Sequence, residues 1–226
     1  MTESKRALSD YIYQSKYSLY REDLGRKEVW EESVERIYQM HLTHLGIHAP
    51  AALQDEWFME QLHEAIDYYK QKKFVGSQRN LQFGGEPVLK SSAKSYNCSY
   101  SHCDRLEVFR EIEWLLLSGC GCGLSVEQAH VDKLPDLLPL EELLEESEVF
   151  RIPDSIEGWS DAIHRLLEFF FVPGTTRPVF DYTDIRPKGS KIAGRFLAPG
   201  PDGLRIALDN IRKLLREAVT AGQRRL

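Results

Sequence analysis

The chain has 226 residues, of which 42% are hydrophobic and 28% are charged, a balance typical of globular proteins. Its formal net charge of -6 argues against binding long nucleic acids or anionic membranes, but not against a local site for one nucleotide. No apolar run approaches the roughly 18 residues of a membrane-spanning helix, and the N-terminus lacks the apolar core of a signal peptide. We therefore expect a cytoplasmic protein with no nucleic-acid or membrane partner.

The first third of the chain is predicted to be helical. Apolar residues at helical spacing indicate a helix over 27–46, ended by Gly46, and a second helix over 53–69. Residues 1–26 have no clear period and are interpreted as an arm. Glycines, a proline and serines across 74–95 indicate loops. We therefore predict a helical domain over 1–75 and a second domain over 76–226.

The second domain has the alternating pattern of an α/β fold. Its predicted elements are a strand at 96–100, a helix from Asp104 as N-cap to Gly119, a strand at 122–126, a helix capped by Asp154 and Glu157 and stopped at 172–174, a strand at 179–182, and a last helix over 204–218. The acidic segment 132–148 is interpreted as a surface excursion with a short helix. Strands that alternate with helices predict a parallel sheet with crossover helices.

Four cysteines fall close together in the sequence, namely Cys98, Cys103, Cys120 and Cys122. Without an export signal, this favours reduced thiols over a disulfide framework. Zinc is a weaker interpretation, because the spacings are not the repeated knuckle pairs of structural zinc sites, and we predict no metal site. On its position alone, Cys98 is more simply a small buried hydrophobe than a redox residue.

Two glycine-containing segments suggest ligand sites. Gly119, Gly121 and Gly123 alternate before a strand, which suits either close approach of the backbone to a ligand or tight helix–strand packing. The long loop 184–201 carries several cations, Arg186, Lys188, Lys191 and Arg195. These cations suit an anionic ligand such as phosphate, although solvated surface charge is the simpler interpretation.

Six segments in order resemble one family of enzymes. They are SQR at 77–79, YNCSY at 96–100, LSGCGCGLSV at 117–126, HVDKLP at 130–135, IPDSIEGW at 152–159 and DYTDIRPKGS at 181–190. Together they resemble the N-terminal part of an adenosylcobalamin-dependent (class II) ribonucleotide reductase. Each motif alone is weak, but the six in order are specific.

The resemblance implies a fold and a chemistry. The implied fold is a helical N-terminal region followed by the first half of a ten-stranded α/β barrel. Members of the family replace the ribose 2′-hydroxyl of a ribonucleotide by hydrogen through a thiyl radical that adenosylcobalamin generates. Two further cysteines supply the reducing electrons, and a thioredoxin- or glutaredoxin-like partner restores them.

The resemblance also assigns roles to particular residues. Cys98 matches the first cysteine of the redox pair, which reverses the interpretation from position alone. Asn97 and Ser99 flank it at the substrate wall, Ser77 matches the loop that meets the substrate phosphate, and Gly121 with Gly123 match the turn that lies against the substrate. Four residues match the loop that links a deoxynucleotide effector to the substrate site, namely Gly189, Ser190, Lys191 and Arg195.

The sequence departs from the family pattern in two ways. Cys122 replaces a usual valine or isoleucine, and the segment after Ser190 lacks the usual proline and glycine pair. The radical cysteine, the second redox cysteine and most of the cobalamin site have no match here. We therefore expect an inactive segment that needs a complementary C-terminal half. The alternative is a non-catalytic nucleotide-binding or assembly module derived from the reductase barrel.

Overall fold

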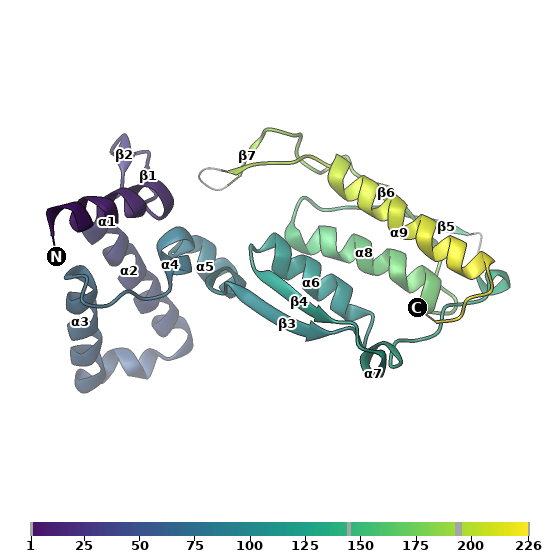
Figure 1. Ribbon diagram of the computed structural model, residues 1–226, viewed down its shortest axis with the longest axis horizontal. Coiled ribbons are helices and arrows are strands. Elements are labelled where there is room, and N and C mark those ends of the chain that lie inside the picture. Colours follow the sequence, from purple (N-terminus) through teal and green to yellow (C-terminus); the bar gives the residue numbers. More distant parts are fainter. Residues whose placement is uncertain (1, 144–145, 193–195, 226) are drawn as a thin grey trace. The chain divides into compact units, whose positions relative to one another are not determined.

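The computed structural model describes residues 2–143, 146–192 and 196–225. It divides into two compact units, Met1–Asn97 and Cys98–Leu226, which are called here the helical unit and the α/β unit (Figure 1). The segment 76–97, which the sequence assigned to the second domain, groups with the helical unit. This segment was expected to be loops, but it forms the short helices that connect the two long helices to the first strand of the α/β unit.

Among its described residues, the helical unit contains five α-helices and one small hairpin. They are α1 (Glu3–Lys16), α2 (Trp30–His48), α3 (Glu56–Lys70), α4 (Gln78–Phe83), α5 (Glu86–Lys90) and the strands β1 (Tyr20–Arg21) and β2 (Arg26–Lys27), with 3-10 turns at Pro50–Gln54 and Ser92–Ser95. The two long predicted helices are confirmed as α2 and α3. Two details were wrong: residues 3–16 form a helix instead of an irregular arm, and α2 continues through Gly46.

Both errors have physical reasons. Among its described residues α1 buries one side chain, Tyr13, so its apolar period is too weak to read from the sequence. Gly46 keeps a negative φ, and the helix ends at His48 because Ala49 precedes Pro50, which disfavours a helical conformation in the residue before it.

Arg36 of α2 holds the short helix α4 against the centre of the helical unit. Its guanidinium donates to the Glu28 carboxylate at 2.7 and 2.9 Å, and to the carbonyl oxygens of Leu81 at 2.9 Å and Gly84 at 2.8 Å. The Glu28 side chain is only 3% exposed. An apolar cluster that includes Trp30, Val34 and Leu81 surrounds this polar group, so one arginine satisfies a buried carboxylate and a helix end together.

The α/β unit contains two parallel strand pairs, each joined by a helix. The first is β3 (Cys98–His102), α6 (Glu107–Leu117) and β4 (Gly121–Ser125), and the second is β5 (Ser147–Arg151), α8 (Ile156–Phe171) and β6 (Arg177–Asp181). The remaining elements are α7 (Gln128–Val131), a 3-10 turn at Leu140–Glu142, the antiparallel strands β7 (Lys191–Ile192) and β8 (Phe196–Leu197), and α9 (Asp202–Thr220).

The α/β class is confirmed, but a single parallel sheet is not. In the described part of the chain, the strands form separate two-stranded sheets, so half of a ten-stranded barrel is not seen. Strand β5 was missed, because residues 132–148 read as an acidic surface segment. Along β5 Phe150 is half-buried and the other residues are exposed, so the strand shows no alternation of buried and exposed side chains.

Two predicted helix starts were also displaced. Helix α6 begins at Glu107, and the Asp104 carboxylate accepts a hydrogen bond from Arg105 instead of capping the helix. At α8 the cap is Ser155, whose Oγ accepts from the Gly158 amide at 3.0 Å. The predicted helix end is confirmed at Gly119, where a φ of 87° turns the chain and lets Cys120 donate to the Leu115 carbonyl.

Each parallel pair has one face covered by helices of its unit and one face without such cover. The main core joins buried side chains of α8, including Leu166 and Phe170, to Leu204 and Leu208 of α9. Helices α6, α8 and α9 follow one another side by side along the strand pairs (Figure 1). On the other face of the second pair, Val149 and Val179 stay 68% and 43% exposed. Two-stranded sheets are marginal by themselves, so these bare faces suit a packing partner or a ligand.

We predict that Gly158→Ala destabilises the protein by about 1–3 kcal/mol, although alanine favours a helix. A Cβ at this position would lie 2.5 Å from the Pro153 carbonyl oxygen, a rigid backbone atom. The matched control is Gly203→Ala in the first turn of α9, where a Cβ meets nothing within 4 Å and a neutral or stabilising effect is expected. Urea unfolding followed by circular dichroism measures both changes. Equal effects of the two substitutions would contradict the steric argument.

Candidate functional site

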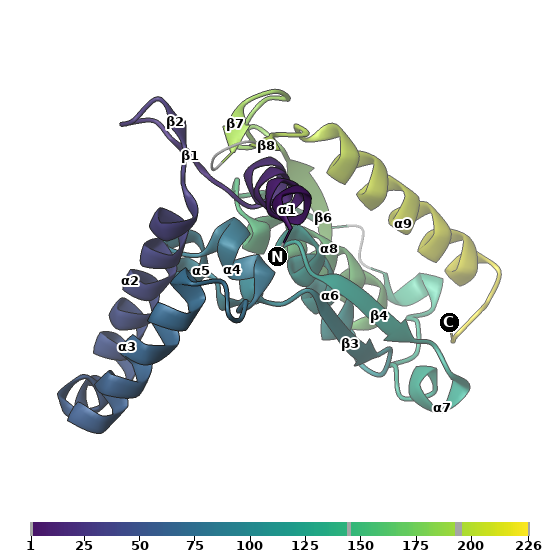
Figure 2. The same cartoon turned by 60° about the vertical axis from the view of Figure 1, so that its left-hand side comes forward.

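The strand pair β3–β4 carries the predicted catalytic cysteine on its bare face. Parallel pairing sets Cys98 opposite Gly121 and Tyr100 opposite Gly123. Because side chains alternate along a strand, those of Cys98, Tyr100 and His102 share one face, whereas α6 packs on the opposite face (Figure 2). We call the bare side, with Gly121 and Gly123, the uncovered face.

The Cys98 thiol is exposed on this face, next to backbone that carries no side chain. Its register partner is Gly121, and at Gly123 an added Cβ would come within 3.2 Å of the Tyr100 ring. The glycines therefore leave a strip of bare backbone beside the thiol, with the Tyr100 ring lying along it. The interpretation of Cys98 as a buried hydrophobe is wrong, because the residue is solvent-accessible.

Ser99 and Cys122 lie on the opposite, helix-covered face of the same strands. Ser99 Oγ donates a hydrogen bond to Cys122 Sγ at 3.1 Å, and both residues are half-buried. The Ser99 side chain thus points away from Cys98, and only its backbone remains beside the uncovered face.

The other two cysteines are buried. Cys120 is 2% exposed and Cys103 is 5% exposed. Burial, with a smaller contribution from Asp104, raises the pKa of the Cys103 thiol and disfavours the reactive thiolate. Of the four thiols, Cys98 is therefore the most exposed.

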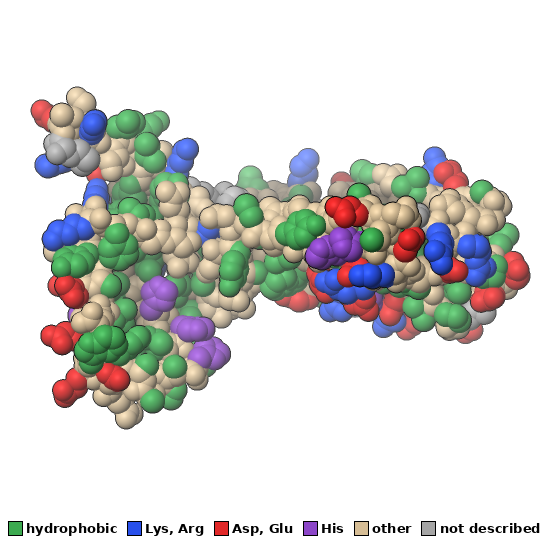
Figure 3. Space-filling view, turned by 60° about the horizontal axis from the view of Figure 1, so that its bottom comes forward, with side chains coloured by type: hydrophobic (Ala, Val, Ile, Leu, Met, Phe, Trp, Pro, Cys, Tyr) green, Lys and Arg blue, Asp and Glu red, His purple; other side chains and the backbone are tan. Residues whose placement is uncertain are grey.

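Two aromatic residues of the uncovered face were not identified from the sequence. The rings of Tyr100 and His102 lie 5.1 Å apart, and His102 packs 4.1 Å from His130, whose Nδ1 is 3.0 Å from Ser125 Oγ. Histidine side chains are visible on both units in Figure 3. The period-two alternation from Cys98 to His102 was the signal that could have placed Tyr100 and His102 beside the thiol.

The other predicted site residues occupy three places. Asn97 is exposed and directly precedes β3 as the last residue of the helical unit, and Ser77 lies earlier in that unit, directly before α4. Gly189 has a φ of 89° and lies in the turn that leads into β7. Its amide donates to the Ala198 carbonyl, and the Ser190 carbonyl accepts from the Ala198 amide. Lys191 is the first residue of β7, and Arg195 lies outside the described residues.

The expected open loop at 184–201 is thus partly a small antiparallel hairpin. Lys191 pairs with Leu197, and Ser190 Oγ donates to the Pro187 carbonyl at 2.8 Å. Arg186, one of the four loop cations, donates to Asp154 at 2.5 Å, so its charge is already paired. The phosphate interpretation of this loop therefore depends on its other cations.

No metal centre emerges in the part of the chain that the structure describes. Its histidine, cysteine, aspartate and glutamate side chains form no group of three or more that could hold a metal ion. None of its helices is long and apolar enough to cross a membrane.

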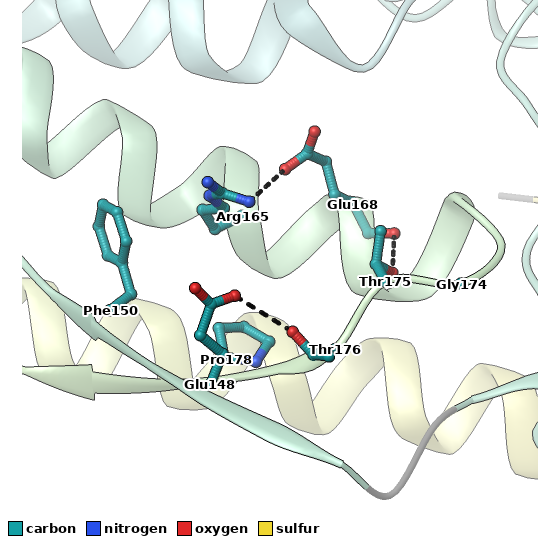
Figure 4. Close-up of a pocket in the computed structure, with 8 residues that line it drawn as sticks. All are labelled: Glu148, Phe150, Arg165, Glu168, Gly174, Thr175, Thr176 and Pro178. Atoms are coloured by element: carbon teal, nitrogen blue, oxygen red, sulfur yellow. Dashed lines mark hydrogen bonds and ion pairs between the residues drawn. The ribbon is translucent and has the colours of Figure 1, made fainter.

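A hollow of about 250 Å³ lies between β5–β6 and the end of α8 (Figure 4). Its polar groups bind one another: Arg165 pairs with Glu168 at 3.9 Å, and Thr176 donates to Glu148 at 3.3 Å. These groups leave few free contacts for a ligand, so the uncovered face remains the stronger candidate site.

Comparison with known proteins supports the family resemblance over almost the whole chain. No protein-family profile matches the chain. An adenosylcobalamin-dependent ribonucleoside-triphosphate reductase of Euglena gracilis is 28% identical over 223 residues, and a probable one of Dictyostelium discoideum is 26% identical over 236 residues. These alignments cover 93% and 94% of this chain, but only 29% and 31% of the relatives.

A solved structure shares the fold. The crystal structure of a B-12-dependent (class II) ribonucleotide reductase superposes with a TM-score of 0.75 at 20% identity, covering 95% of this chain and 37% of that one. The chain therefore spans about a third of the length of the proteins it matches. The resemblance inferred from the six motifs is confirmed.

Proposed function

We propose that this chain is the part of an adenosylcobalamin-dependent ribonucleotide reductase that supplies the first redox cysteine and one wall of the substrate site. The observation that carries the proposal is the exposed Cys98 thiol on the uncovered face, opposite Gly121. The similarity to reductases over 93% of the chain supplies the chemical context.

Cys98 acts in the proposed reaction as one of two electron-donating thiols. The ribose 2′-hydroxyl leaves as water and is replaced by hydrogen, while two thiols lose their hydrogens and join as a disulfide. One ribonucleotide and two thiols thus give one deoxyribonucleotide, one disulfide and one water. Cys98 provides one thiol, and its partner lies in the part of the reductase that the alignments do not cover. A thioredoxin- or glutaredoxin-like dithiol then reduces the disulfide.

The bare backbone around Cys98 suits the approach of a ribose ring. A side chain at position 121 would lie on the uncovered face beside the Cys98 thiol, and a Cβ at position 123 would contact the Tyr100 ring. Glycine at both positions lets a substrate contact the strand directly. Asn97, which directly precedes the same strand, provides an amide for hydrogen bonds to the sugar. In the assembled enzyme Ser77 would meet the substrate phosphate, and the segment from Gly189 to Arg195 would connect to a deoxynucleotide effector.

Adenosylcobalamin supplies the radical that starts the reaction when it is bound in the complete enzyme. The uncovered face offers a thiol, a phenol, an imidazole and bare backbone. This set fits a substrate wall better than a corrin site, so we place most of the cofactor site outside residues 1–226. The role of this chain is to present and orient the thiol.

The proposal predicts that residues 1–226 alone do not reduce ribonucleotides. We expect deoxyribonucleotide formation only after the chain is joined to the remaining part of a relative, such as the Euglena gracilis reductase. The assay contains ribonucleoside triphosphate, adenosylcobalamin and a dithiol, and chromatography measures the product. Deoxyribonucleotide made by residues 1–226 alone would refute the need for a complement.

The alternative function is a non-catalytic nucleotide-binding or assembly module. It predicts that the chimera gains no activity, or that its activity does not depend on Cys98. The substitution of Cys98 considered in the Discussion therefore separates the two functions.

A further inference from the structure

A hollow of about 360 Å³ lies between α9 and the free edge of β6, away from the uncovered face. Four arginines line it, namely Arg177 of β6 and Arg205, Arg212 and Arg216 of α9. Among the described residues that line it, Asp209 is the single carboxylate. We call this the arginine hollow. In a chain with a net charge of -6, it is a local concentration of positive charge.

The three arginines of α9 face the hollow together because of helical geometry. Their spacing of seven and four residues returns to the same side of a helix with 3.6 residues per turn. Two of them stack on aromatic rings. The guanidinium carbon of Arg205 lies 4.8 Å from the ring centre of Tyr182, just after β6, and that of Arg212 lies 5.6 Å from the ring centre of Phe180 in β6. Stacking orients a guanidinium but leaves its N–H edges available to a ligand.

Among the described residues, most of these guanidiniums have no anionic partner. Arg212 is held by Asp209 at 3.4 Å and by the Pro178 carbonyl at 3.2 Å. Within the described ranges, no side-chain hydrogen bond or ion pair is recorded for Arg177, Arg205 or Arg216. The hollow of Figure 4 differs, because its arginine already has a carboxylate partner.

The free edge of β6 disfavours another β-strand as the occupant of the hollow. Arg177 donates its amide to Glu146 and Asp181 accepts from Ile152, so Pro178 and Phe180 turn their backbone groups away from β5. Pro178 has no N–H to offer, and Arg212 already covers its carbonyl. Proline and a charged side chain are the usual means of blocking strand addition. A small anion is therefore the better fit.

We propose that the arginine hollow binds a polyphosphate group, such as that of a nucleoside triphosphate. Planar guanidiniums bind phosphate oxygens in pairs of hydrogen bonds, and several of them match the spread charge of linked phosphates. The volume suits a small ligand. The proposal uses neither Cys98 nor the uncovered face, so it is independent of the proposed reductase function.

Calorimetric titration of the full chain with inorganic tripolyphosphate tests the proposal. Binding is expected to weaken by about tenfold in Arg205→Gln and again in Arg216→Gln, because each loses a charge-assisted hydrogen bond worth about 1.5 kcal/mol. The matched control is Lys213→Gln, which removes one charge from the same helix outside the hollow, where the lysine pairs with Glu217. That control should change the affinity less than about twofold at physiological salt.

A gain in affinity gives a second test that does not depend on loss of structure. Asp209→Asn removes the one lining carboxylate and should tighten binding. The proposal is overturned if the double arginine variant binds as tightly as the native chain, or if Lys213→Gln weakens binding equally. Titration with ATP identifies the source of the group: similar affinity supports a nucleotide, and binding of tripolyphosphate alone supports inorganic polyphosphate.

Discussion

Cys98→Ser is expected to abolish sustained ribonucleotide reduction by the chimeric enzyme, because a serine hydroxyl cannot be oxidised to a disulfide. The loss in rate with a thioredoxin-like reductant should reach about three orders of magnitude, the scale seen when one member of a catalytic unit is removed. The thiol is exposed on the uncovered face, so the substitution changes little of the packing. Steady-state production of deoxyribonucleotide measures the effect.

The matched control is Cys122→Ser on the neighbouring strand. It makes the same chemical change on the helix-covered face, where the sulfur accepts a hydrogen bond from Ser99. This variant should keep most of the activity and lose some stability. If Cys98→Ser remained fully active over many turnovers, Cys98 would not be a redox residue and the assembly-module function would be favoured.

Arg36→Met should lower the free energy of unfolding by about 3–5 kcal/mol, since it leaves the Glu28 carboxylate buried without its charged partner. The Glu28 side chain is 3% exposed, and Arg36 also holds the end of α4 through the Leu81 and Gly84 carbonyls. Urea unfolding followed by circular dichroism measures the loss. A control is Arg26→Met, whose partner Glu32 is more exposed, so that its loss should lower the free energy of unfolding much less.

The same pair makes the stability depend on pH. Burial by itself raises the pKa of Glu28, but hydrogen bonds from Arg36 and Ser33 outweigh it and lower the pKa below its ordinary value of 4.5. The stabilisation is therefore complete above the pKa of the unfolded chain and is lost as the pH falls through the lower pKa of the folded chain. The difference in free energy of unfolding between the native protein and Arg36→Met should become smaller in acid, because protonation of Glu28 removes the unpaired charge. A gap that widens in acid would contradict this assignment.

The sequence alone determined the helices with strong apolar periods and the order of the α/β elements other than β5. Helices α2, α3, α8 and α9 bury a stripe of side chains, and such a stripe is visible in the residue order itself. It also determined the family resemblance, because six short motifs in order do not depend on how the chain folds. Weakly buried elements such as α1 and β5 left no such stripe and were missed.

Only the tertiary structure decided which side chains meet at the candidate site. The pairing of Cys98 with Gly121 depends on register between strands separated by a helix, and a shift by one residue would exchange the two faces. That register set the thiol beside the bare backbone of Gly121, and the packing of α6 decided that Ser99, and not Cys98, faces the helix. The arginine hollow likewise needs α9 packed along the edge of β6, a long-range contact that no local pattern encodes.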